Sequence, residues 1–186
     1  MVLAQNFAQQ AKPGDIICLK GDLGAGKTAF AQGYAKGLGY SGYVTSPTFT
    51  LMQIYEGVYK GAYEGAYEGV YKDVKMPIYH FDLYRLMDEG FGLDASLETS
   101  RETSLEASLE ASLEDIGFFD YLNADGVCLI EWAEYAKAFI PPGAIWIEIR
   151  KGNSLDGNED KNGRENDRGN EREDGRENER IINFSY

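Results

Sequence analysis

Side chains that often carry chemistry are scarce in this sequence, which has one histidine and two cysteines among 186 residues. Cys18 and Cys128 each lie inside an apolar run, and this setting favours small buried strand residues over a metal site or a redox pair. No apolar run approaches the ~20 residues that a membrane-spanning helix needs. The start, MVLAQNFAQQAK, lacks the basic and apolar regions of a signal peptide. We therefore expect a cytoplasmic protein without membrane contact.

The excess of acidic residues is unevenly distributed along the chain. The formal net charge is −13, and three repetitive stretches carry most of it: −2 in 56–73, −5 in 94–114 and −4 in 152–180. About −2 remains for everything else. The charge of the remaining chain therefore neither requires nor excludes an RNA partner.

Low-complexity insertions interrupt the chain at about 56–73, 95–114 and 152–179. The first repeats tyrosine and glycine every four residues, which predicts a loop or a hairpin extension, because glycine at this interval weakens a helix. The second is rich in Leu, Ala and Glu and is expected to extend a helix. The third is rich in glycine, has almost no apolar residues and is expected to be disordered. Units this short do not indicate a solenoid, so we interpret 1–186 as a single domain with insertions.

Outside the insertions, the chain alternates between expected strands and expected helices. The expected strands are 15–20, 43–44, 48–55, 78–84, 127–131, 144–150 and 181–184. The expected helices are 27–38, a helix from the second repeat through about 122, and 132–139. This alternation predicts an α/β fold with a mostly parallel central sheet flanked by helices.

The segment GDLGAGKT matches the pattern G-x-x-x-x-G-K-T and lies between an expected apolar strand and an expected helix. In such a loop, backbone N–H groups and the helix N-terminus bind phosphate oxygens. Lys27 is expected to reach the outer phosphates, and the Thr28 hydroxyl to ligate Mg²⁺. The candidate nucleotide-binding residues are Gly21, Asp22, Leu23, Gly24, Ala25, Gly26, Lys27 and Thr28. The motif predicts a P-loop NTPase that holds the phosphates of ATP or GTP, and the GTPase motif NKxD is absent, which agrees with ATP.

Two further expected strands carry a carboxylate at or near their ends. VCLIEW resembles a Walker B segment in which Glu131 takes the place of the usual Asp and would hold Mg²⁺ directly or through water. In HFDLYR, Asp82 is a candidate for orienting the attacking water or completing the metal shell, and its alternative role is that of a helix-capping or loop acid. We interpret His80 as an ordinary strand residue, and Arg85 as either a phosphate or RNA contact or a surface ion pair.

A proline-containing segment, TSPTFT, follows the P-loop helix. It resembles the switch segment of GTPases, in which a hydroxyl group senses the γ-phosphate. It also fits a proline-marked turn between two strands. Spacing alone leaves both interpretations open.

Taken in order, GDLGAGKT, VTSPTFTL, YHFDLYRL and LIEW closely resemble the motifs of the bacterial TsaE (YjeE) family. The resemblance covers nearly the whole chain outside the repeats. In that family the proteins are small ATPases of the pathway that places threonylcarbamoyl on an adenosine of certain tRNAs. The resemblance therefore implies a P-loop ATPase that uses ATP and Mg²⁺, works with TsaB and TsaD, and meets tRNA indirectly through that complex.

The resemblance also implies roles for individual residues. Lys27 and Asp82 become catalytic residues, while Thr28 and Glu131 become ligands of Mg²⁺. The nucleotide-sensing turn is then formed by Ser46 and Thr48, and Trp132 is a neighbour of the site. The chain departs from the family at its short start, where relatives usually carry a residue that contacts the nucleotide base.

Two other functions are compatible with a P-loop. A free-standing small-molecule kinase would usually have a lid with arginines near mid-chain, whereas the mid-chain insertion here has one arginine, Arg101, among glutamates. A non-catalytic nucleotide-binding module would not need the candidate catalytic and metal-binding side chains, which are all present. The leading interpretation is a partner-dependent ATPase of tRNA modification.

Overall fold

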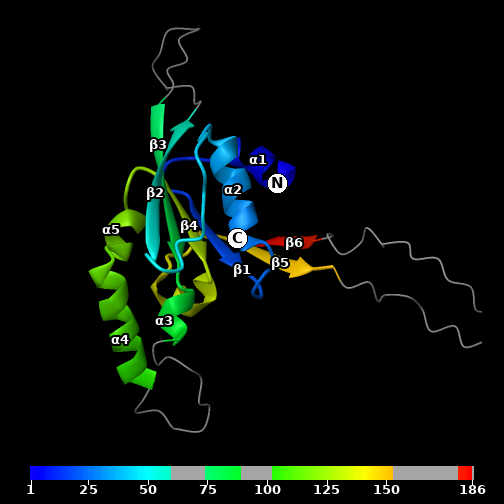
Figure 1. The fold of residues 1–186 in the computed structure, drawn as a ribbon. Helices are drawn as coiled ribbons and strands as arrows, with labels where there is room; N and C mark the ends of the chain where they lie inside the picture. The colour runs from blue at the N-terminus through cyan, green and yellow to red at the C-terminus, as the bar shows by residue number, and fades with distance from the viewer. Residues whose placement is uncertain (60–73, 89–101, 153–179, 186) are drawn as a thin grey trace, which may run out of the picture.

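The computed structural model describes residues 1–59, 74–88, 102–152 and 180–185 (Figure 1). The helices are α1 (Val2–Ala8), α2 (Lys27–Gly37), α3 (Tyr84–Asp88), α4 (Glu102–Asp115), α5 (Phe118–Leu122) and the 3₁₀ helix η1 (Ala133–Phe139). The strands are β1 (Ile16–Lys20), β2 (Met52–Tyr59), β3 (Val74–Asp82), β4 (Val127–Glu131), β5 (Ile145–Lys151) and β6 (Arg180–Ser185). No helix among these residues is long and apolar enough to span a bilayer.

One six-stranded sheet with the order β2-β3-β4-β1-β5-β6 organises the fold. The four inner strands are parallel, whereas β2 and β6 run antiparallel at the two edges. Parallel strands need crossover connections, and these bring helices onto both faces of the sheet. The predicted α/β fold with a mostly parallel, helix-flanked sheet is confirmed.

Alternate residues of the inner strands supply two apolar cores. Ile17 and Leu19 of β1 belong to the core under α1 and α2, while Ile16 and Cys18 belong to the core under α4, α5 and η1. Figure 1 shows α1 and α2 on one side of the sheet and α4 and α5 on the other. Burial raises the pKa of the Cys18 and Cys128 thiols to about 12. Both cysteines are free and buried in strands, as expected from their sequence context.

Helix α1 was not expected from the sequence, and it packs against α2 through small residues. A Cβ atom added at Gly33 would lie 3.0 Å from Cβ of Ala4, and one at Gly37 would lie 2.7 Å from Cβ of Ala8. The two glycines therefore let the helices approach more closely than any larger residue would. This contact places the first residues of the chain beside the start of α2.

Two expected elements differ in the structure. Residues 43–51 form no strand, and β2 begins at Met52. A tight turn replaces the expected strand, because the N–H of Leu51 bonds to the carbonyl of Pro47 at 2.6 Å and Leu51 has φ = 63°. Trp132 is not helical either: it has φ = 61° and precedes η1, in which Ala136 departs from helical geometry.

The second repeat forms a helix where the structure describes it, as the composition predicts. Leu113 is fully buried and Leu109 packs against the same core. The helix does not continue unbroken to 122, because Gly117 has φ = 70° and separates α4 from α5. Part of the first repeat extends the β2–β3 hairpin up to the pairing of Tyr59 with Val74. The rest of the first repeat and almost all of the third lie outside the described residues.

Candidate nucleotide site

The P-loop joins the carboxyl end of β1 to the first turn of α2. Its glycines have positive φ values, including 147° at Gly21 and 112° at Gly26. A Cβ atom at Gly21 would lie 2.2 Å from the carbonyl oxygen of Ile149, so no larger residue fits there. Because the loop leads directly into an 11-residue helix, its backbone N–H groups and the helix dipole both favour an anion at this position.

Lys27 lies over this loop and is only 4% exposed. Its Nζ donates to the carbonyl of Gly21 at 2.5 Å and to that of Asp22 at 3.0 Å. The ammonium group also lies 3.4 Å from the centroid of the Trp132 ring, within the range of a cation–π interaction. Burial lowers the pKa of Lys27, while nearby carboxylates, with Glu131 the strongest, oppose this effect.

The pairing of β3, β4 and β1 brings the two predicted acids together. Glu131 is in register with Leu19 at the end of β1 and with Asp82 at the end of β3. Oε2 of Glu131 accepts a hydrogen bond from the Thr28 hydroxyl at 2.9 Å. The predicted metal ligands, Thr28 and Glu131, therefore lie next to each other at the mouth of the P-loop.

Asp82 joins the TSPTFT segment to this edge of the sheet. Its Oδ2 accepts hydrogen bonds from the Thr48 hydroxyl at 2.6 Å and from the Ser46 hydroxyl. Its Oδ1 accepts the backbone N–H of Tyr84 at 3.0 Å, at the start of α3. Asp82 thus caps the start of α3, one of the two roles considered from the sequence. It also lines the candidate pocket, and its role toward water or metal stays a prediction.

Arg85 also binds the TSPTFT segment. Its Nη1 donates to the carbonyl of Phe49 at 2.6 Å. The segment is a turn before β2, as one interpretation predicts, and it also places Ser46 and Thr48 beside the P-loop, as the other requires. No strand forms at 43–44, directly before this turn, and a role of the two hydroxyl groups in sensing the γ-phosphate stays a prediction.

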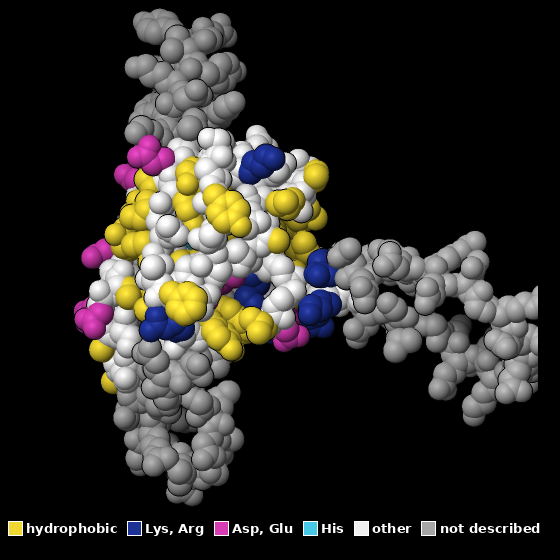
Figure 2. All heavy atoms as spheres, in the orientation of Figure 1, with side chains coloured by type: hydrophobic (Ala, Val, Ile, Leu, Met, Phe, Trp, Pro, Cys, Tyr) yellow, Lys and Arg dark blue, Asp and Glu magenta, His cyan; other side chains and the backbone are white. Residues whose placement is uncertain are grey.

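These groups line one pocket of about 400 Å³. The lining residues are Leu23, Gly24, Gly26, Lys27, Thr28, Ser46, Thr48, Asp82, Tyr84, Glu131 and Trp132. Figure 2 shows a hollow on this face with basic and acidic side chains inside it and hydrophobic side chains around it. Three predicted binding residues, Gly21, Asp22 and Ala25, do not line the pocket, although the carbonyls of the first two bind Lys27.

The donor set fits Mg²⁺. Thr28 and Glu131 offer hard oxygen ligands, which this ion prefers. Within the described ranges there is no cluster of three or more His, Cys, Asp or Glu residues arranged around a metal position. Mg²⁺ usually takes one or two protein oxygens and completes its shell with phosphates and water, so a hydroxyl and one carboxylate beside a phosphate cradle suffice.

A second pocket, of about 240 Å³, lies on the outer side of the P-loop. Its lining residues are Met1, Leu3, Ala4, Ala25, Gly26, Ala29, Phe30, Ile149, Arg180 and Ile182. The Nε of Arg180 donates to the carbonyl of Ala25 at 3.0 Å, which ties β6 to the loop. Sequence reasoning missed this pocket because it combines the two ends of the described chain with the start of α2.

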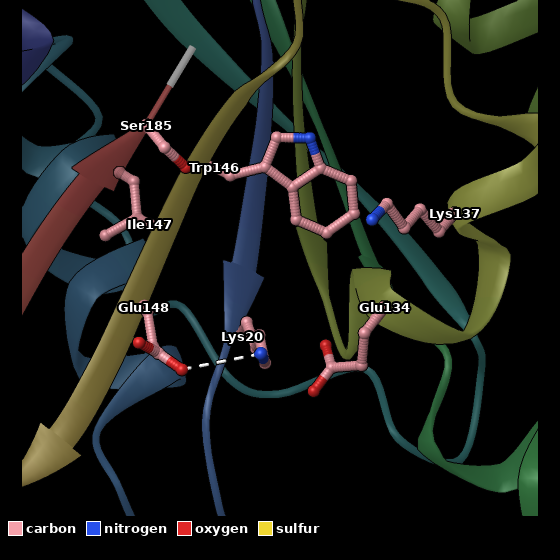
Figure 3. A pocket seen from close by; sticks show the side chains of 7 residues that line it. All are labelled: Lys20, Glu134, Lys137, Trp146, Ile147, Glu148 and Ser185. Carbon is pink, nitrogen blue, oxygen red and sulfur yellow. Dashed lines mark ion pairs between the residues drawn. The ribbon is translucent and has the colours of Figure 1, made fainter.

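A third pocket, of about 370 Å³, lies between η1 and β5 (Figure 3). Its lining residues are Lys20, Glu134, Lys137, Trp146, Ile147, Glu148 and Ser185. Glu148 pairs with Lys20 at 3.4 Å and with Arg150 at 2.8 Å. Burial raises the pKa of Glu134, and the positive charges of Lys27 and Lys20 oppose this rise. Because Glu148 already pairs with two cations, we assign no ligand to this pocket.

Comparison with known proteins places this chain in a family. The family model for threonylcarbamoyl adenosine biosynthesis protein TsaE matches residues 1–160. The chain is 35% identical over 149 residues to the tRNA threonylcarbamoyladenosine biosynthesis protein TsaE of Bacillus subtilis, covering 80% of this chain and 70% of the relative. It is also 35% identical over 134 residues to TsaE of Haemophilus influenzae, covering 72% and 61% of the two chains.

The same name recurs in a third relative, TsaE of Rickettsia prowazekii, which is 33% identical over 148 residues and covers 79% of this chain and 76% of its own. Among solved structures, the crystal structure of Bacillus subtilis YdiB is 32% identical, covers 81% of this chain and 69% of that one, and has a TM-score of 0.48. The sequence relatives confirm the resemblance that the four motifs indicate. The chain therefore belongs to the TsaE family, whose members take part in tRNA threonylcarbamoyladenosine biosynthesis.

Proposed function

We propose that this chain is a Mg²⁺-dependent ATPase that supports threonylcarbamoyl modification of tRNA adenosine together with TsaB and TsaD partners. The observation that carries the proposal is the convergence of Lys27, Thr28, Asp82 and Glu131 on one pocket at a P-loop. Membership of the TsaE family supports the pathway. Because the modified molecule is tRNA, we place the protein in the cytoplasm.

The chain's own groups account for binding and orientation of the nucleotide. The loop N–H groups hold the β- and γ-phosphates, and Lys27 exchanges its bonds to loop carbonyls for bonds to phosphate oxygens. Thr28 and Glu131 hold Mg²⁺, which when bound neutralises charge on the phosphate oxygens. Asp82 accepts a hydrogen bond from the attacking water, and Ser46 and Thr48 link the position of the turn to that carboxylate.

A substitution at Asp82 is expected to affect ATP hydrolysis far more than ATP binding. Asp82→Asn keeps the shape of the side chain but removes the negative charge, so phosphate release should fall by about 10²–10⁴-fold, the usual contribution of a positioned acid or base. ATP affinity should change far less, because the loop holds the phosphates. Phosphate release with partners present and isothermal titration of ATP measure the two effects.

Asp120→Asn is the matched control, because Asp120 is an exposed acid in the first turn of α5 and lies outside the pocket. The control should keep the wild-type rate of phosphate release and the wild-type affinity for ATP. Hydrolysis by Asp82→Asn at the wild-type rate would remove Asp82 from the mechanism.

We assign the adenine base to the pocket on the outer side of the P-loop. The pocket adjoins Gly26 at the start of α2, and most of its other lining side chains are apolar, as an aromatic base requires. Met1, Leu3 and Ala4 of the first helix region line it on one side.

This assignment predicts that Ala29→Leu, which adds bulk to the pocket, lowers the affinity for ATP about tenfold, equivalent to about 1.4 kcal/mol. Inorganic triphosphate should bind the variant as it binds the wild type, since it has no base. Isothermal titration with both ligands tests the assignment. Equal weakening of ATP and triphosphate would show that the substitution disturbs the loop and that the base lies elsewhere.

A further inference from the structure

The only histidine of the chain, His80, does more than fill space in its strand. His80 lies on the same face of β3 as Asp82 and is fully buried. Its Nε2 lies 2.9 Å from Oε1 of Glu131, while the other oxygen of Glu131 accepts the Thr28 hydroxyl. The interpretation of His80 as an ordinary strand residue therefore misses its contact with the candidate metal ligand.

The direction of this hydrogen bond follows from the chemistry of the pair. A carboxylate only accepts, so Nε2 of His80 is the donor. Its Nδ1 is buried and has no hydrogen-bond partner among the described residues. A buried polar ring is unfavourable unless it is bonded, and the one hydrogen bond that His80 makes within the described ranges is to Glu131.

The bond fixes a rotatable group. Glu131 is 2% exposed, and its two oxygens are held by two different donors, His80 and Thr28. Without His80, the carboxylate would be held on one side only and could rotate away from Thr28. Hydrogen bonds to the groups that ligate a metal orient those ligands, and their loss typically reduces metal affinity about 10–100-fold.

We propose that His80 is a positioning residue that orients Glu131 for the divalent cation, and this inference rests on the proposed function of the site. His80 contributes to binding of the cation and not to binding of the phosphates. The phosphate cradle of the P-loop does not touch His80, so ATP binding without the cation does not depend on it. The donor at the Nε2 position, rather than the bulk of the ring, carries the effect.

Four variants test this. His80→Leu removes the donor and keeps apolar bulk, whereas His80→Gln places an amide N–H at the same distance along the side chain as Nε2. His80→Asn places its amide near Nδ1, too short to reach Glu131. Ile78→Val trims a fully buried neighbour on the same face of β3 without touching Glu131. Thermal unfolding reports the stability of each.

The readout is ATP binding by isothermal titration, first in EDTA and then over a series of Mg²⁺ concentrations. In EDTA all variants should match the wild type within about twofold. The Mg²⁺ concentration that produces half of the maximal change in ATP affinity should rise about tenfold in His80→Leu and His80→Asn. It should return toward the wild-type value in His80→Gln and stay unchanged in Ile78→Val.

Wild-type Mg²⁺ dependence in His80→Leu would overturn the inference and leave the proposed function standing. The inference would also be overturned if His80→Gln behaved like His80→Leu, because the effect would then follow packing rather than the donor. If Mg²⁺ had no effect on ATP binding by the wild-type protein, the metal site itself would be wrong, and the proposed function would fail together with the inference.

Discussion

Lys27→Ala is expected to lower the affinity for Mg²⁺·ATP by about 100-fold or more. Hydrogen bonds from a charged donor contribute about 1.5–3 kcal/mol each, and the ammonium group of Lys27 already lies at the loop, 2.5 Å from the carbonyl oxygen of Gly21. In the variant, the phosphates would meet backbone donors but no cation from α2. Isothermal titration of ATP with Mg²⁺ measures the loss.

The control is Lys36→Ala, which removes an exposed lysine from the last turn of the same helix. It should bind ATP as the wild type does. Because Lys27 is buried and bonded to two carbonyls, its variant should also be checked by thermal unfolding. A folded Lys27→Ala protein with unchanged ATP affinity would contradict the assignment of the P-loop.

The parts of the site that sequence could predict are those that lie close together in the chain. A phosphate cradle needs successive N–H groups, so the eight residues from Gly21 to Thr28 carry its pattern in one segment. The two strand-end acids are also recognisable locally, because an apolar strand ending in a carboxylate stands out. Their alignment, Asp82 beside Glu131, depends on strand order and register, which the assembled sheet supplies.

The parts that sequence missed depend on contacts between distant residues. His80 and Glu131 are 51 residues apart, and nothing in HFDLYR indicates which neighbour the imidazole meets. The strand expected at 48–55 begins only at Met52, because the Thr48 hydroxyl bonds to Asp82 and the chain turns back at Leu51. Both differences concentrate at the candidate site, where side-chain bonds override local strand propensity.

Partner proteins are expected to raise the rate of ATP hydrolysis strongly. Lys27 is the one cation among the described residues that line the nucleotide pocket. P-loop enzymes often use an arginine finger, and one supplied by a partner raises the rate by about 10³–10⁵-fold. We therefore expect slow phosphate release by the chain alone and a large increase with a TsaB–TsaD complex from the same organism.

Exposed apolar side chains near the nucleotide pocket suggest where that complex docks. Leu23 on the P-loop is 73% exposed, and Phe49 on the TSPTFT turn is 85% exposed. Large apolar side chains clustered on a surface mark interaction sites. A partner that contacts Phe49 would also act on the turn that holds Ser46 and Thr48 against Asp82, and would thereby link docking to hydrolysis.

Phe49→Asp should therefore abolish stimulation by the partners while leaving ATP affinity unchanged, because the side chain of Phe49 does not line the nucleotide pocket. Ile54→Asp, at an exposed position on the edge strand β2, is the control and should be stimulated like the wild type. Phosphate release is measured with each chain alone, with partners, and with partners plus substrate tRNA. Rapid hydrolysis by the lone wild-type chain, without any response to partners, would contradict the partner-dependent mechanism and favour a free-standing kinase or ATPase.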